Sequence, residues 1–276
     1  MFQTCPAKYD LRIRQHWSSR KKSAALGFGG ALHEGLAAWY RTKDRAKAIT
    51  AIHDSWPQNV PIDDWRTKEK CISVFMAYVK EYPEETFQVV GAPDNPMVEC
   101  TFTLDTGLCL DDGEPILYGG IFDGLVEYSG SVYVLEHKST SQMGSYYFDQ
   151  FKPNNQVTGY VWAAGLLSGK RVGGAIVNAL GIYKASPTKF ERQITTRSEA
   201  SIVEWLNNIK HSCEMIRERE RTGYWPMYTG SCTMYGKCEY HDVHLLATEN
   251  ERSRMLEQNY VREAWDHELR EGVKDE

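Results

Sequence analysis

Two hydrophobic runs with charged ends dominate the stretch GGIFDGLVEYSGSVYVLEHKST, residues 119–140. Apolar and β-branched residues predict two strands here, and the Ser-Gly pair at 129–130 predicts the tight turn between them. In such a hairpin Asp123 lies across from Glu136. Glu136 and Lys138 are two residues apart and so face the same side of the strand. We therefore expect two carboxylates and an ammonium group to converge at one edge of a sheet.

This combination of charges is typical of metal-assisted phosphodiester hydrolysis. Two carboxylates at close range repel each other unless a cation lies between them. Oxygen ligands favour Mg²⁺ or Mn²⁺, and a lysine beside the metal can orient a water or stabilise negative charge on a phosphate. The plainer alternative is a salt-bridged hairpin in which Lys138 pairs with Asp123 or Glu136 on a solvated face.

Hydrophobic spacing divides the rest of the chain into further elements. Helices are expected at 27–56, 63–82, 154–169, 198–223 and about 247–270, and strands at 97–105, 116–127, 131–137, 171–184 and 189–197. This order predicts an α/β fold with a mixed central sheet rather than repeated βαβ units. The final charged helix has few apolar residues and is expected on a surface or at an interface.

Composition describes an ordinary globular protein. The 276 residues suit one large domain, or one domain with an appended module, and 42% of them are hydrophobic. No apolar stretch reaches the ~20 residues that a membrane helix needs. The N-terminus has no apolar signal core, so a cytoplasmic protein is expected. The net charge of −5 argues against binding of nucleic acid by bulk charge alone, but leaves room for a local basic groove.

The motif with Asp123, Glu136 and Lys138 resembles motifs II and III of the PD-(D/E)xK nuclease superfamily. The match is closest to the RecB-type exonuclease branch, which includes AddB and the CRISPR-associated adaptation exonucleases with iron–sulfur clusters. Two further motifs of that branch are present. GGALHEGL supplies Gly29, His33 and Leu36 of a G-x-x-x-H-x-x-L pattern, and QVTGY supplies Gln156 and Tyr160 of Q-x-x-x-Y.

The resemblance implies a fold and a set of roles. The fold is restriction-endonuclease-like, with a mixed central β-sheet flanked by helices. The implied metal ligands are His33, Asp123, Glu136 and the backbone carbonyl of His137, and the implied catalytic residues are Asp123, Glu136 and Lys138. Gln156 and Tyr160 are implied to hold the DNA backbone near the scissile phosphate. Glu99 matches an acidic residue often found on the preceding strand. Taken singly, each residue has a plainer interpretation, since helix histidines are usually core or boundary residues and i, i+4 pairs are ordinary neighbours.

Three of the seven cysteines form a separate pattern near the chain ends. An odd count and no export signal disfavour a disulfide framework. In the iron–sulfur members of the branch, one N-terminal cysteine followed by proline joins three C-terminal cysteines around a 4Fe–4S cluster. Cys5, Cys232 and Cys238 fit this pattern, and His244 stands where the family has its fourth cysteine. Structural zinc and no metal at all are the alternatives.

These observations predict a domain organisation. The chain is expected to be a single nuclease domain with a core of about 27–200. The cysteine-rich module would combine residues 1–22 with 224–246, because the metal centre would join the two chain ends.

The predicted function is a Mg²⁺- or Mn²⁺-dependent DNA exonuclease that acts from single-stranded ends in recombination, repair or phage DNA metabolism. DNA is the expected partner, with a helicase or recombination protein as a further candidate and no membrane. DNA contacts are expected from Arg12, Arg14, Lys21 and Lys22, from Tyr9, Trp17 and Tyr235, and from Lys184, Lys189, Arg192 and Arg197 along the same groove. The plain alternative for these is solvated surface. A rival function is a DNA-end-binding recombination accessory protein with little or no cleavage. A third is a structural zinc protein in which the triplet is accidental.

Overall fold

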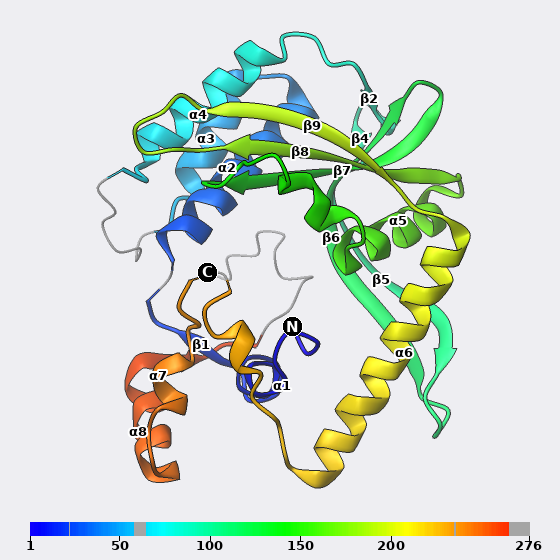
Figure 1. The fold of residues 1–276 in the computed structure, drawn as a ribbon. Helices are drawn as coiled ribbons and strands as arrows, with labels where there is room; N and C mark the ends of the chain where they lie inside the picture. Colours follow the sequence, from blue (N-terminus) through cyan, green and yellow to red (C-terminus); the bar gives the residue numbers. More distant parts are fainter. Residues whose placement is uncertain (22, 58–64, 235, 265–276) are drawn as a thin grey trace. The chain divides into compact units, whose positions relative to one another are not determined.

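The computed structural model describes residues 1–21, 23–57, 65–234 and 236–264, which fall into two compact units (Figure 1). The smaller unit comprises Met1–Lys22, Asp105–Ile116 and Asn207–Glu276, and the larger comprises Ser23–Leu104 and Leu117–Leu206.

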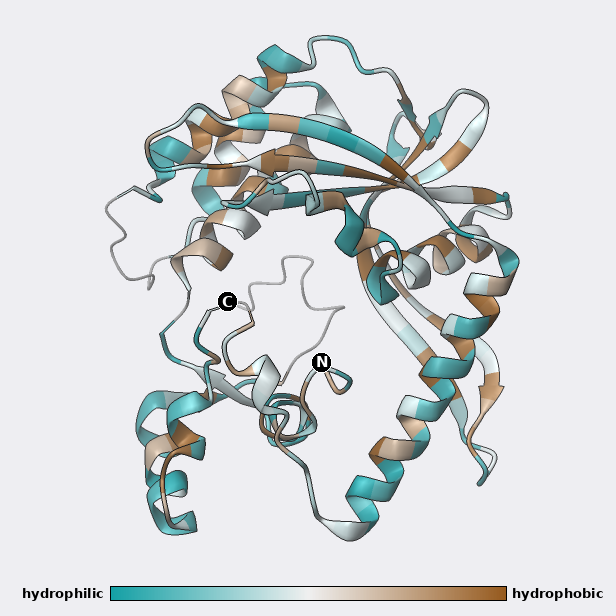
Figure 2. Ribbon diagram, in the orientation of Figure 1, coloured by the Kyte–Doolittle hydropathy of each residue, from teal (hydrophilic) through white to brown (hydrophobic). Residues whose placement is uncertain are grey.

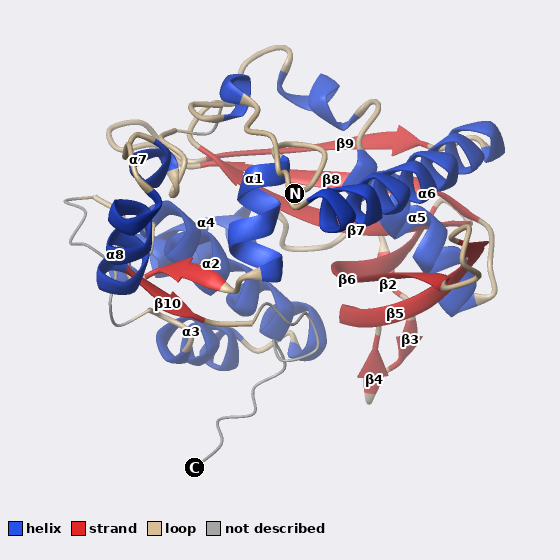
Figure 3. Cartoon of the chain, turned by 90° about the horizontal axis from the view of Figure 1, so that it is seen from below, coloured by secondary structure: helices blue, strands red, loops and turns tan. Residues whose placement is uncertain are grey.

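Among the described residues, a six-stranded mixed sheet organises the larger unit. Its strands are β2 (Gln88–Val89), β5 (Val98–Cys109), β6 (Pro115–Tyr128), β7 (Ser131–Thr140), β8 (Val172–Gly181) and β9 (Lys189–Thr196). The order is β2-β6-β7-β8-β9, with β5 also paired to β6. The β7–β8 pair is parallel, whereas β6–β7 and β8–β9 are antiparallel (Figure 3). The predicted mixed α/β sheet is confirmed. A separate two-stranded ribbon joins β3 (Gly91–Ala92) to β4 (Asn95–Pro96).

The β6–β7 hairpin has the turn that the sequence predicted. Ser129 and Gly130 both adopt positive φ, at 49° and 74°, which is the pattern of a two-residue type I′ turn. Register runs from Tyr128 opposite Ser131 to Gly124 opposite Leu135. The next residue on each strand is therefore the acidic one, at the end of the paired stretch.

Helices cover both faces of this sheet. Helices α2 (Ala24–Thr42), α3 (Arg45–Asp54) and α4 (Lys68–Glu81) pack on the face that carries Leu135 and Ile176. Helix α5 (Asn155–Ser168) and the 3₁₀ turn η2 (Tyr147–Phe151) pack on the face that carries Val134 and Val177. Because η2 and α5 connect the parallel strands β7 and β8, they place their residues beside the end of β7 (Figure 1).

The single helix expected over 27–56 is two helices. Lys43 adopts a left-handed conformation with φ of 54°, and ends α2. The side chain of Asp44 then accepts the backbone N–H groups of Ala46 and Lys47 and so begins α3. An apolar spacing that continues through both helices hides this break.

The smaller unit contains both the first and the last described segments of the chain. Its elements are α1 (Pro6–Tyr9), the π-helical turn η1 (Asp10–Arg14), β1 (Trp17–Ser19), η3 (Thr229–Ser231), α7 (His241–His244), α8 (Glu249–Asn259) and β10 (Tyr260–Arg262). Strand β1 pairs with β10 in antiparallel register, and the hydroxyl of Tyr240 donates to the carbonyl of Trp17. Helix α6 (Glu199–Thr222) begins in the larger unit and ends in the smaller.

The charged C-terminal helix is shorter than expected. It was predicted to run to about residue 270, but α8 ends at Asn259; the predicted part beyond residue 264 lies outside the described residues. The reason is that Tyr260 is 4% exposed in the core beside Tyr240, and the chain is extended there to pair with β1. Most of α8 is hydrophilic, whereas β8 is largely hydrophobic (Figure 2). No helix in the described ranges combines the length and apolar character that crossing a membrane requires.

Candidate active site

Side chains from a helix and two strands converge at the edge of the sheet. The Nδ1 atom of His33, on α2, lies 3.1 Å from Oδ1 of Asp123, on β6. Glu99, on β5, completes a group whose possible ligand atoms all lie within 4.8 Å of one another. Within the part of the chain that the structure describes, this is the one group of three or more histidine, cysteine or acidic side chains that meets this distance.

Helix α2 brings His33 to this edge by a close approach to β7. Leu32 and Leu36 are fully buried in the core, and this fixes the helix face that packs on the sheet. A Cβ atom built at Gly29 would lie 3.2 Å from the Oγ of Ser139, near the end of β7. The glycine four residues before the histidine therefore allows the helix to lie close to the strand.

Asp123 is held as a carboxylate by two donors. Its Oδ2 accepts the backbone N–H of His137 at 2.5 Å, while its Oδ1 faces His33. Burial alone would raise the pKa of Asp123, but these two neighbours outweigh it and hold the pKa well below its usual range. Burial also lowers the pKa of His33, yet the Asp123 charge prevails and raises it to about 9. Without a metal, the two form an ion pair at neutral pH.

Glu99 occupies a strained position beside this pair. Its φ of 52° is in the left-handed region, which costs a residue with a side chain about 1–2 kcal/mol. Burial, followed by repulsion from Asp123, raises the pKa of Glu99 to about 8. Strain of this kind clusters at functional sites, and a cation between the two carboxylates would remove their repulsion. From the sequence, Glu99 was expected only as a match to an acidic residue often found on this strand.

Glu136 and Lys138 form the second half of the site. Glu136 is 3% exposed, and its Oε1 accepts from Lys138 Nζ at 2.6 Å. Its Oε2 is buried and has no hydrogen-bond partner among the described residues. Burial raises the pKa of Glu136 to about 7. A buried carboxylate oxygen without a donor is suited to bind a cation, because leaving it unpaired costs free energy.

Lys138 connects the strand to helix α5. Its Nζ donates to Oε1 of Gln156 at 2.9 Å, and Nε2 of Gln156 donates to the hydroxyl of Tyr160 at 3.2 Å. Burial lowers the pKa of Lys138, but Glu136 more than offsets this and the pKa is raised, so the side chain stays charged. Asn154 caps α5 by accepting the N–H of Val157, which places Gln156 in the first turn.

The residues fit a hard divalent cation. Carboxylates of Glu99, Asp123 and Glu136 offer oxygen, the ligand that Mg²⁺ and Mn²⁺ prefer, and His33 offers one nitrogen. The structure therefore brings together the two carboxylates, histidine, lysine, glutamine and tyrosine that the sequence singled out.

A comparison with protein families decides the identity of this arrangement. The chain matches the sequence model of the PD-(D/E)XK nuclease superfamily over residues 1–243. The chain belongs to this superfamily. Its members use divalent metal ions, which agrees with the His33, Glu99 and Asp123 group.

One solved structure supports the fold of this superfamily member. A crystal structure of a candidate exonuclease from Eubacterium rectale is similar with a TM-score of 0.50 and 11% identity, over 89% of this chain and 82% of that one. The crystal structure of the protein SSO0001 gives a TM-score of 0.31 and 12% identity, over 70% and 76% of the two chains. Only the first likeness is high enough to indicate a shared fold. A comparison with curated proteins found no match.

His137 of this superfamily member points away from Glu136, into the opposite face of the sheet. Its ring is 3% exposed and stacks on Tyr40, with ring centroids 5.6 Å apart and planes 21° apart. Asn178 Nδ2 lies 2.7 Å from His137 Nδ1. Burial lowers the pKa of His137 to about 3, so the ring is neutral.

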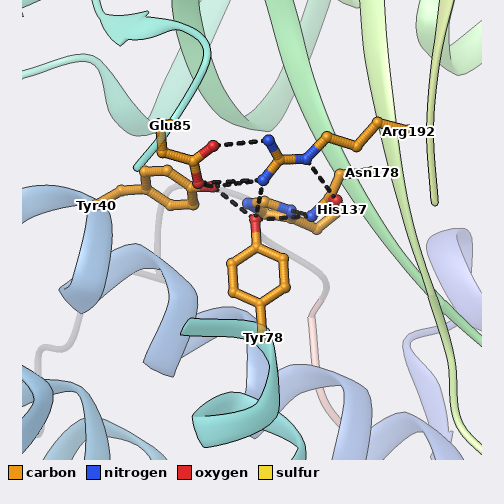
Figure 4. Close-up of polar contacts among 6 residues, drawn as sticks. All are labelled: Tyr40, Tyr78, Glu85, His137, Asn178 and Arg192. Carbon is orange, nitrogen blue, oxygen red and sulfur yellow. Dashed lines mark hydrogen bonds and ion pairs between the residues drawn. The ribbon is translucent and has the colours of Figure 1, made fainter. Parts of the chain in front are cut away.

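The sequence did not predict the buried polar cluster that lies behind His137 (Figure 4). It consists of Tyr40, Tyr78, Glu85, His137, Asn178 and Arg192. Arg192 was predicted to lie along a DNA groove, and this is wrong. Its side chain is 13% exposed and its guanidinium binds Glu85 and Asn178. An asparagine inside the apolar run of β8 was the one available signal.

The basic contacts predicted near the N-terminus belong to the smaller unit, and two of them are already engaged there. Arg12 donates to the carbonyl of Glu263 at 2.7 Å, and Arg14 pairs with Asp10 at 2.6 Å. Lys21 is exposed. Two predicted contacts, Lys22 and Tyr235, lie outside the described residues. Trp17 was expected to stack on bases, but this is wrong, because it is 8% exposed in the core of its unit.

The cysteine set also lies in the smaller unit. Cys5 is buried and Cys232 and Cys238 are half-buried, and all three thiols are free. Cys238 N–H donates to the carbonyl of Cys232 at 2.8 Å, so these two share a turn. Among described residues, Cys5, Cys232, Cys238 and His244 do not form a tight group of the kind made by His33, Glu99 and Asp123. The iron–sulfur centre therefore stays a prediction, as does its zinc alternative.

Proposed function

We propose that this protein is a Mg²⁺- or Mn²⁺-dependent deoxyribonuclease that degrades DNA from single-stranded ends. The observation that carries the proposal is the convergence of His33, Glu99 and Asp123 within 4.8 Å, beside the buried Glu136–Lys138 pair. Membership of a nuclease superfamily supports phosphodiester hydrolysis. The four motifs of the RecB-type branch, and the likeness to a candidate exonuclease, support cleavage from ends.

The metal would be held by His33, Asp123, Glu136 and the backbone carbonyl of His137, with Glu99 as an additional ligand. When bound, it would supply Lewis-acid stabilisation of the phosphate and lower the pKa of a bound water. Asp123 is already ionised, and the free Oε2 of Glu136 is available to bind.

Lys138 would orient the attacking water or a phosphate oxygen. Because its pKa is raised, it holds its proton and acts as a fixed positive donor rather than as a base. Glu136 and Gln156 fix the direction of its Nζ. Tyr160 accepts from Gln156 and keeps its own O–H, which can donate to the DNA backbone.

An iron–sulfur cluster in the smaller unit is a separate proposal. Cys5, Cys232, Cys238 and His244 would bind a 4Fe–4S cluster that ties residues 1–20 to 225–244 around the single nuclease domain. All four belong to one compact unit, which supports it. Protein purified without oxygen should contain iron and absorb visible light broadly. Finding neither iron nor zinc would remove this cluster and leave the nuclease site untouched.

The wider setting would be recombination, repair or phage DNA metabolism, with a helicase or recombination protein as partner. The rival function, DNA-end binding without cleavage, predicts a different result in one assay. End-labelled single- and double-stranded DNA is incubated with Mg²⁺, Mn²⁺ or EDTA over a time course. We expect metal-dependent loss of the single-stranded substrate from its ends. Binding without cleavage in every metal would favour the rival.

A further inference from the structure

The cluster behind His137 has a fixed direction of hydrogen bonding. The Nε of Arg192 donates to Oδ1 of Asn178 at 3.1 Å. An arginine guanidinium can only donate, so this contact identifies the oxygen of the asparagine amide. The amide nitrogen of Asn178 therefore donates to His137 Nδ1, 2.7 Å away. A neutral imidazole that accepts at Nδ1 carries its proton on Nε2.

Arg192 is itself immobilised. Its Nη1 and Nη2 donate to the two carboxylate oxygens of Glu85 at 2.6 Å and 3.1 Å. Nη2 also donates to the hydroxyl of Tyr78 at 2.8 Å, and the guanidinium lies 3.6 Å from the ring centroid of Tyr82. Planar, bidentate pairing of this kind fixes orientation as well as charge. The strands maintain the arrangement, because Arg192 of β9 is opposite Asn178 of β8 in register.

His137 transmits this order to the metal site through its backbone. It is the residue between Glu136 and Lys138, its N–H donates to Asp123, and its carbonyl is the proposed fourth ligand. Asn178 is opposite His137 in the parallel β7–β8 register and is fully buried. The contact with Asn178 and the stacking on Tyr40 hold the ring in one orientation, and the buried ring in turn anchors the stretch of β7 backbone whose N–H faces Asp123.

We infer that Arg192 and Asn178 are positioning residues for the nuclease site: they fix the tautomer and orientation of His137, and thereby hold its N–H and carbonyl in place for metal binding and turnover. The inference rests on the proposed function. The alternative is that the cluster only stabilises the fold. A purely stabilising network would fix the same tautomer, so the two roles differ in whether Mn²⁺ affinity and kcat depend on it; buried ion pairs are in any case weak contributors to stability compared with apolar packing.

The substitution Asn178→Asp separates the two roles. The aspartate is nearly the same size and can still accept from Arg192, but it has no N–H to donate to His137. His137 must then place a proton on Nδ1 to hydrogen-bond with it. We expect ¹⁵N imidazole spectra at pH 7 to show the proton on Nε2 in wild type and on Nδ1 in Asn178→Asp. With this change, Mn²⁺ affinity and kcat should each fall about 10–100-fold, while KM for DNA stays within about twofold.

Two further variants complete the experiment. Arg192→Lys keeps a positive charge beside Glu85 but loses the bidentate fork, and should weaken Mn²⁺ binding in the same direction. Thr195→Val is the matched control. Thr195 is a buried polar residue on the same strand, opposite Ala175, and bonds the carbonyl of Phe151 at 3.2 Å. It should lower thermal stability without changing Mn²⁺ affinity or the spectrum of His137.

Each outcome decides between the claims. A wild-type His137 protonated on Nδ1 would overturn the inference even if both variants failed to fold. So would unchanged Mn²⁺ affinity and kcat in an Asn178→Asp protein whose proton has moved. Equal losses in Thr195→Val would reduce the cluster to a stabilising role. Absence of cleavage by wild-type protein in any metal would instead overturn the proposed function, because the spectra and Mn²⁺ binding do not depend on DNA.

Discussion

His33 Nδ1 lies 3.1 Å from Asp123 Oδ1, although the two residues are 90 positions apart in the chain. This contact joins helix α2 to strand β6 at the point where β6 separates from β7. In metal-free protein it is an ion pair, and in metal-bound protein the same two side chains are proposed ligands. Protons and the metal ion therefore compete for the same side chains, His33 and Asp123.

The stability of the metal-free protein should fall as the pH rises from about 5 to about 9. The pKa of His33 is raised to about 9, so its contribution is complete below its unfolded pKa of about 6.5 and is lost as the pH passes about 9. The pKa values of Glu136 and Glu99 are raised to about 7 and about 8, so folding favours their neutral forms and loses free energy as each ionises.

Asp123 has the opposite sign, but its depressed pKa acts only below about pH 4. Together the raised groups predict a loss on the order of a few kcal/mol. Urea unfolding in EDTA at pH 6 and pH 9 measures this loss. A free energy of unfolding that increased over that range would contradict the assigned charges.

Metal binding should show the reverse dependence on pH. Ligands must be deprotonated to bind, so Mn²⁺ has to displace the His33 proton and any proton on Glu136 or Glu99. Affinity should increase severalfold per pH unit between pH 6 and pH 8, with proton release detectable by calorimetry in buffers of different ionisation enthalpy. His33→Ala should show weaker binding with a shallower pH dependence; an unchanged slope would place the ion elsewhere.

Lys138→Ala should abolish DNA cleavage while leaving Mn²⁺ bound. A fixed donor of this kind contributes about 10²–10³-fold to turnover, and its removal also leaves Glu136 Oε1 without its partner. The exposed Lys80 on α4 provides the matched control, and Lys80→Ala should cleave at the wild-type rate. Full activity of Lys138→Ala on end-labelled DNA would refute the role given to the lysine.

Glu99→Gly should separate stability from function. Glycine adopts the positive φ of this position without cost, and the substitution removes one of two repelling carboxylates. We expect metal-free protein to gain about 1 kcal/mol and Mn²⁺ affinity to fall about tenfold or more. Glu99→Gln keeps the strain and should lose affinity without the gain. Normal Mn²⁺ binding by both variants would show that Glu99 is no ligand.

Tyr160→Phe should affect DNA binding more than chemistry. The proposed contact to the DNA backbone is uniform binding, so its loss raises KM by about 5–10-fold with little change in kcat. Steady-state kinetics on single-stranded DNA measure both constants. A fall in kcat at constant KM would indicate that Tyr160 acts in the transition state instead.

The hairpin and its register could be predicted from the sequence because their signals are local. Apolar runs, the Ser-Gly turn and the charged strand ends all lie within residues 119–140, and the turn geometry fixes which residues face each other. His33 and Gln156 were found by motif order. The break between α2 and α3 was missed because the apolar spacing continues across Asp44, although that residue is a capping signal.

Other features depend on contacts that no short pattern records. The sequence around Arg192 predicts a surface charge, and only the β8–β9 register shows that it lies opposite Asn178. Trp17 and Tyr260 enter the same core only when β1 pairs with β10, and this pairing also ends α8 early. The assignment of Glu99 as a metal ligand depends on its backbone conformation, which the alternation of strand residues does not predict.

The most direct test of the central claim is diffraction from crystals grown with Mn²⁺, with anomalous scattering used to locate the ion. We predict a strong anomalous peak within coordination distance of His33, Asp123 and Glu136, with Lys138 close to a metal-bound water. A peak elsewhere, or no peak at a Mn²⁺ concentration that supports cleavage, would contradict the account.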